Sequence, residues 1–203
     1  MILVYDCEIA RAIPRKNKPP IHGIKYCGGW RDFEGMGIAC ICVYDYQTDS
    51  THVFCMDNLG GFLDLVEERQ VIVGYNNWNF DDPLVDAHGV HIPDKKSYDL
   101  YKEIYLAHGY SFADRVGGLK LENCAKVNLG GRSKTDDPAM APVNWQRGKI
   151  GAVIDYCMAD VFMIRDLLDL VIEGRFISPH TKRRLQVRPP RKYQKYCIKG
   201  LKT

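Results

Sequence analysis

The sequence lacks the features that mark membrane, secreted and zinc-stabilised proteins. No apolar run approaches the roughly 20 residues of a membrane span. The first residues, Met1 to Asp6, lack the basic region and cleavage site of a signal peptide. Eight cysteines are present, but none are paired as C-x-x-C, so a structural zinc site is not expected. We therefore predict a cytoplasmic protein, without membrane contact, whose cysteines are buried reduced thiols.

Charge is distributed unevenly along the chain. Of the 203 residues, 46% are apolar, which predicts one folded domain. Residues 175–203 contain ten Lys/Arg and no Asp/Glu, leaving 18 Lys/Arg against 25 Asp/Glu in residues 1–174. An acidic body with a basic end is typical of a polyanion binder, although a basic run also occurs as plain solvated surface. We predict a domain over residues 1–174 and a basic C-terminal tail over 175–203.

Hydrophobic periodicity predicts strands early in the chain and helices later. The expected strands cover residues 2–5, 37–45, 51–56 and 71–73, and the expected helices cover 61–69, 80–88, 98–108, 118–127 and 150–171. This order predicts an α/β or α+β sheet with helices packed on its faces. Residues 10–36 form an irregular loop that is rich in Pro, Gly, Lys and Arg and contains Tyr26 and Trp30.

Two carboxylates follow the first expected strand. Side chains alternate across a strand, so Asp6 and Glu8 point to one side and Cys7 to the other. Adjacent carboxylates repel unless a cation lies between them, and hard divalent ions such as Mg²⁺ or Mn²⁺ prefer oxygen ligands. A strand that simply ends in polar residues would look the same.

A polar segment follows the strand at 71–73. It reads G-Y-N-N-W-N-F-D-D-P over residues 74–83, and Pro83 suits the first turn of a helix. Strand ends that lead into such loops are common ligand sites in α/β sheets. Alternatively, Asp81 or Asp82 serves as a helix cap.

The long helix expected at 150–171 contains a third carboxylate. Tyr156 and Asp160 share one face of this helix, beside an apolar stripe that continues through Cys157. Asp160 is therefore expected near the core, where a carboxylate needs a metal or a polar partner. A salt bridge to Arg165 or another basic residue is the alternative.

Together these segments resemble the Exo I, II and III motifs of the DEDD exonuclease superfamily, which has the ribonuclease H-like fold. The sequence D-C-E at residues 6–8 looks like the D-x-E motif, and residues 74–81 are similar to the G-Y-N-x-x-N-F-D form of family B DNA polymerase proofreading domains. Y-C-M-A-D at 156–160 matches the tyrosine subclass, since the histidine subclass would need His where Asp155 stands. The motifs occur in the family's order, and the resemblance covers about residues 1–174.

The resemblance implies a ribonuclease H-like mixed sheet flanked by helices and a two-metal 3′→5′ exonuclease that uses Mg²⁺ or Mn²⁺. It implies that Asp6, Glu8 and Asp160 hold one ion, that Asp6 and Asp81 hold the other, and that Tyr156 orients the attacking water. The resemblance does not fix the substrate, but a narrow cleft suits a single-stranded 3′ end. Phe80 is a candidate for stacking on a base, with core packing as the alternative, and Asn76 and Asn79 would either bond sugar or phosphate or shape the loop. The long basic loop at 10–36 and the tail at 175–203 depart from the family pattern.

Other functions fit the same residues. An RNA-trimming enzyme, or one that cuts structured ends or internal positions, would use the same carboxylates. A silent nucleic-acid-binding module is the alternative from another class, yet all four carboxylates and the tyrosine are present. The sequence favours single-stranded DNA as the substrate without excluding RNA.

Overall fold

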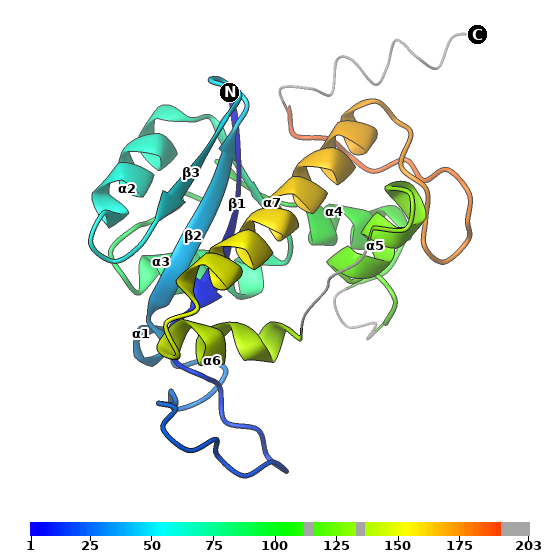
Figure 1. Cartoon of the computed structure of the whole chain (residues 1–203). Helices are drawn as coiled ribbons and strands as arrows, with labels where there is room; N and C mark the ends of the chain where they lie inside the picture. Colours follow the sequence, from blue (N-terminus) through cyan, green and yellow to red (C-terminus); the bar gives the residue numbers. More distant parts are fainter. Residues whose placement is uncertain (112–115, 133–136, 192–203) are drawn as a thin grey trace, which may run out of the picture.

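Five strands form a single mixed sheet at the centre of the molecule. The computed structural model describes residues 1–111, 116–132 and 137–191 (Figure 1). The strand order is β3-β2-β1-β4-β5, in which β1 pairs antiparallel with β2 and parallel with β4. The strands are β1 (Ile2–Ile9), β2 (Ile38–Asp45), β3 (Ser50–Phe54), β4 (Val71–Gly74) and β5 (Ser97–Asp99).

Helices cover both faces of this sheet. They are α1 (Phe33–Met36), α2 (Leu59–Glu68), α3 (Asp81–Asp86), α4 (Leu100–Ala107), α5 (Leu121–Asn128), α6 (Ala141–Gln146) and α7 (Ile150–Ile172), with single 3-10 turns η1 (Asn77–Asn79) and η2 (Pro138–Met140). No helix in the described ranges is long and apolar enough to cross a membrane.

The central strand β1 is buried on both sides, which explains its continuous apolar run. Leu3 and Tyr5 pack with Phe62 of α2 in one core cluster. Ile2 and Val4 point the other way, into a second cluster with the apolar residues of α7. The long helix α7 crosses β1 and β2 (Figure 1), so the even-numbered residues of β1 face this helix.

The structure corrects one expected helix and adds two short ones, α6 and α1, of which α1 lies within the expected irregular loop 10–36. Residues 97–99 form the edge strand β5 and not the first turn of a helix over 98–108, because they pair in parallel with β4 from Ile72 to Gly74. Helix α4 begins only after Asp99, whose side chain accepts a hydrogen bond from the Lys102 amide. The short helix α6 follows the turn that begins at Pro138 and has Pro142 in its own first turn; hydrophobic periodicity does not predict it.

The chain continues along the core after α7 ends. Phe176 and Ser178 are fully buried, and Val187 is nearly so. Arg188 forms a two-bond ion pair with Glu103 of α4, with nitrogen–oxygen distances of 2.6 and 3.0 Å. Residues 192–203, the remainder of the predicted basic tail, lie outside the described residues, and the domain boundary at 174 stays a prediction.

Candidate active site

Three carboxylates meet where α7 crosses β1. Asp6 and Glu8 are two residues apart on β1 and share the face that α7 covers. Asp160 lies in the middle of α7, and one carboxylate oxygen from each of the three residues lies within 4.8 Å of the others. Glu8 is 9% exposed and Asp160 only 3%. The arrangement concentrates negative charge in a poorly hydrated place, which a cation would relieve.

The spacing of these oxygens fits a hard divalent ion. Mg²⁺ binds oxygen at about 2.0–2.1 Å in an octahedron, so two of its ligand oxygens are at most about 4.2 Å apart. Neighbouring ligands of that octahedron lie only about 3.0 Å apart, so oxygens within 4.8 Å of one another would close by up to about 2 Å on sharing one ion. The donor set contains carboxylates alone, as Mg²⁺ and Mn²⁺ prefer.

Asp81 reaches the same strand from a different side. It is the first residue of α3, is 5% exposed, and its Oδ1 accepts a 3.2 Å hydrogen bond from the Cys7 amide. Burial and the nearby charges of Asp82 and Asp99 raise the pKa of Asp81 to about 7, although the Cys7 amide favours the ionised form. Asp81 does not belong to the set of oxygens within 4.8 Å that Asp6, Glu8 and Asp160 form.

Asp82, the neighbouring acid, makes contacts that fix the loop. Its carboxylate accepts hydrogen bonds from the Tyr5 hydroxyl, the Asn77 side-chain amide at 3.1 Å and the Ser97 hydroxyl at 2.7 Å. These partners come from β1, η1 and β5. Asp82 thus holds the start of α3 against the sheet.

The predicted substrate contacts occupy the turn before α3. Asn76 adopts a left-handed backbone conformation (φ 64°), and its side-chain oxygen accepts a 2.8 Å hydrogen bond from exposed Asn79. Phe80 is half-buried and packs edge-on against Phe33 and Trp30, with ring centroids 6.2 and 6.4 Å apart. Trp30 itself is 70% exposed, so an open indole lies beside the predicted base-stacking residue.

Tyr156 stands one helical turn before Asp160 on α7. It is half-buried and lines a small cleft between α6 and α7 together with Asp137 and Asn144. The structure places the tyrosine and Asp160 on one face of α7, as the sequence predicted. The catalytic role of all five residues stays a prediction.

Asp99, which no sequence motif singled out, positions the turn that contains Asn76 and leads into α3. Its carboxylate is 3% exposed and accepts backbone amides from Asn76 at 2.9 Å and from Trp78 at 3.4 Å, while also capping α4. The S-Y-D-L sequence did contain a capping signal, but the neighbouring helical periodicity masked it.

The basic loop at 10–36 is folded against α6. Gln146 donates hydrogen bonds to the carbonyls of Ala10 and Lys25, both at 3.0 Å, and accepts the Lys25 amide at 2.7 Å. Arg15 forms a 3.2 Å ion pair with Asp137. The loop projects beyond the lower ends of α1 and α6 in Figure 1 and has further exposed basic residues at Lys16, Lys18 and Arg31.

The fold is similar to part of a known DNA polymerase. The family B DNA polymerase from the hyperthermophilic archaeon Pyrobaculum calidifontis superposes with a TM-score of 0.59 at 19% identity, covering 91% of this chain and 26% of that chain. The chain thus spans about a quarter of the polymerase's length. No family model and no curated protein matches the sequence. The predicted α/β fold, a mixed sheet flanked by helices, is confirmed.

Proposed function

We propose that the protein is a metal-dependent 3′→5′ exonuclease of the tyrosine DEDD subclass, acting on single-stranded nucleic acid. The observation that carries the proposal is the cluster formed by Asp6, Glu8 and Asp160, which brings carboxylate oxygens of residues more than 150 positions apart within 4.8 Å of one another. The likeness to a family B DNA polymerase supports the fold on which this reaction would run. Single-stranded DNA is the first substrate to test, and RNA is the second.

The carboxylates divide into two groups that suit two ions. Asp6, Glu8 and Asp160 would hold one Mg²⁺ or Mn²⁺, and Asp6 with Asp81, directly or through water, would hold another. When bound, such ions lower the pKa of a water and stabilise the oxygen that leaves the cleaved bond. The hydrogen bond from the Cys7 amide to Asp81 supports this division, because it holds Asp81 beside the strand residue that follows Asp6.

The remaining residues would position the reactants. The Tyr156 hydroxyl would orient the attacking water; it is not expected to act as the base, because free tyrosine titrates near pH 10. Phe80 would stack on the terminal base, while Asn76 and Asn79 would bond the sugar or phosphate. The exposed Lys and Arg of loop 10–36 would follow the backbone phosphates. The product would be a nucleoside 5′-monophosphate.

The deciding experiment is digestion of 5′-labelled single-stranded DNA and RNA with Mg²⁺ or Mn²⁺. A ladder that shortens from the 3′ end, and that EDTA abolishes, is the expected result. Removing a residue that hydrogen-bonds to a metal ligand typically lowers metal affinity or activity by about 10–100-fold. Replacing a ligand itself, as in Asp6→Asn or Asp160→Asn, should therefore lower nuclease activity by at least about 100-fold. Asp155→Asn, an exposed acid on the same helix, is the matched control and should retain full activity. Equal activity in Asp160→Asn and its control would refute the proposal.

A further inference from the structure

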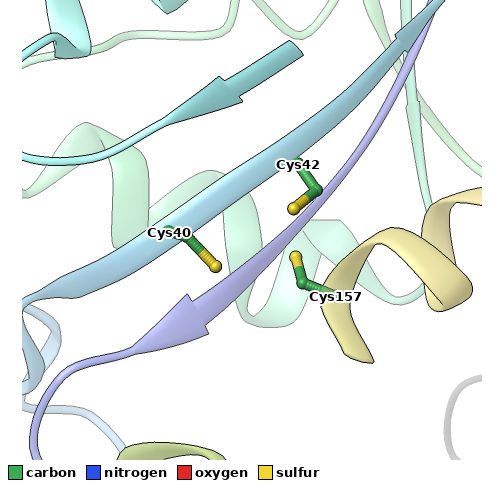
Figure 2. A group of neighbouring side chains, drawn as sticks. All are labelled: Cys40, Cys42 and Cys157. Carbon is green, nitrogen blue, oxygen red and sulfur yellow. The ribbon is translucent and has the colours of Figure 1, made fainter. Parts of the chain in front are cut away.

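Three buried thiols lie together beneath the carboxylate cluster. Cys40 and Cys42 are two residues apart on β2 and so share the face that α7 covers, and Cys157 comes from α7 itself. Their sulfurs all lie within 4.8 Å of one another, and none of the three residues is exposed. Figure 2 shows the three side chains converging between the strand and the helix. We call these residues the thiol cluster.

The thiol cluster is directly connected to the candidate active site. In the sheet register Cys42 lies opposite Asp6, and Cys40 lies opposite Glu8. The Cys157 thiol lies 3.3 Å from the Asp6 carbonyl oxygen and 3.7 Å from its Oδ2. The two clusters therefore share one strand pair and one helix, and Asp6 touches both.

Three convergent sulfurs form a donor set of a particular kind. A Zn²⁺–sulfur bond of about 2.3 Å places the sulfurs of one tetrahedral ion about 3.8 Å apart, so thiols within 4.8 Å need to close by about 1 Å or less. Thiolates select soft ions and not Mg²⁺ or Mn²⁺. Simple packing is the usual role of a buried thiol, and it suffices for Cys7, Cys27 and Cys124, which are buried but belong to no such group in the described part of the chain.

We propose that Cys40, Cys42 and Cys157 form a second metal site, for a thiophilic cation of the Zn²⁺, Cd²⁺ or Cu⁺ class. Each thiol that binds releases its proton to solvent. Asp6 Oδ2 is the carboxylate oxygen placed to complete the ligand set. A soft ion here would draw Asp6 away from the catalytic centre and move α7, and would thereby inhibit the nuclease. The binding itself is independent of the proposed function, whereas the inhibition rests on it.

Cadmium is the probe, because its thiolate complexes absorb in the ultraviolet. The protein is equilibrated overnight with Cd²⁺ in excess Mg²⁺, which keeps the carboxylates occupied. One equivalent of Cd²⁺ should bind, and its binding should produce a thiolate-to-cadmium charge-transfer band in the ultraviolet absorption spectrum. Cys42→Ala and Cys40→Ala should each weaken binding at least tenfold, whereas Cys124→Ala, which removes an equally buried thiol elsewhere, should leave it unchanged. No band in the parent protein, or an equal band in Cys42→Ala, would overturn the site.

Two further measurements test metal binding by the thiol cluster separately from inhibition of the nuclease. Cadmium NMR of the unsubstituted protein distinguishes sulfur from oxygen ligation, so the test survives a variant that fails to fold; a resonance typical of oxygen ligands alone would overturn the proposal. Nuclease activity is then measured with one equivalent of Cd²⁺ in excess Mg²⁺. Inhibition of the parent but not of Cys42→Ala supports coupling through Asp6, and equal inhibition of both overturns it. Absence of any nuclease activity would refute the proposed function while leaving the binding result intact.

Discussion

Replacing Asp81 with Asn should stabilise the metal-free protein at neutral pH. The Asp81 carboxyl is buried, and its pKa is raised to about 7 by burial and by the charges of Asp82 and Asp99. An Asn side-chain oxygen can still accept the Cys7 amide, which now bonds Asp81 at 3.2 Å. The substitution therefore removes the charge and its pH dependence while keeping the local hydrogen bond.

The sign and size of this effect follow from linkage. Well below the ordinary Asp pKa of about 3.9, the carboxyl is protonated in both the folded and the unfolded chain, so it contributes nothing to the difference in stability. As the pH rises, the unfolded chain ionises first, and the parent loses stability relative to the variant until the folded group also ionises near pH 7. A shift of about three units at 1.36 kcal/mol each limits the loss to about 4 kcal/mol.

The assay is urea denaturation in EDTA at pH about 4, 6 and 8. The difference in unfolding free energy between Asp81→Asn and the parent should grow from near zero to a few kcal/mol as the pH rises. Saturating Mg²⁺ should stabilise the parent, by about 2.7 kcal/mol at 100 times its Kd, and Asp81→Asn by less. A difference that is flat with pH, or a variant less stable than the parent at pH about 8, would refute the reasoning.

Three other predictions concern the candidate site. Tyr156→Phe should slow single-turnover cleavage at least about tenfold with little change in DNA affinity; normal turnover would argue against an orienting role. Trp30→Ala should weaken binding of single-stranded oligonucleotides by about 1–3 kcal/mol, measured by fluorescence anisotropy, with an unchanged melting temperature because the indole is 70% exposed. Asp99→Ala should lower the unfolding free energy by about 1–3 kcal/mol and also lower activity, because two turn amides and the α4 N-terminus lose their acceptor. A cleavage rate equal to that of the parent would contradict its positioning role.

The sequence was informative wherever local periodicity decides geometry. Asp6 and Glu8 share a face because strand side chains alternate, and Tyr156 and Asp160 share one because a helix repeats every 3.6 residues. These rules place residues on faces without any knowledge of the fold. The meeting of the two faces then depended on the family resemblance, since only the packing of α7 on β1 brings Asp160 to Asp6.

Features built from distant partners were not readable from the sequence. Asp99 holds the turn at 76–78 because β5 pairs beside β4, and a three-residue edge strand has too few residues to show a period of two. The thiol cluster combines residues more than 110 positions apart, so a search for C-x-x-C spacing does not find it. Gln146 holds loop 10–36 by hydrogen bonds to backbone carbonyls. Every residue has such a carbonyl, so the sequence does not indicate which ones Gln146 bonds.

The position of Asp81 follows from a difference in strand length. Parallel pairing between β1 and β4 ends at Val4, opposite Val73, whereas β1 continues to Ile9. Beyond that point the edge of β1 facing β4 has no parallel strand partner, and a buried amide there needs another acceptor. The Cys7 amide finds it in Asp81. The same strand thus presents Asp6 and Glu8 through side chains on one face and holds Asp81 through its backbone edge. A β4 longer by two residues would compete with Asp81 for the Cys7 amide; β4 instead ends at Gly74, where the polar turn begins.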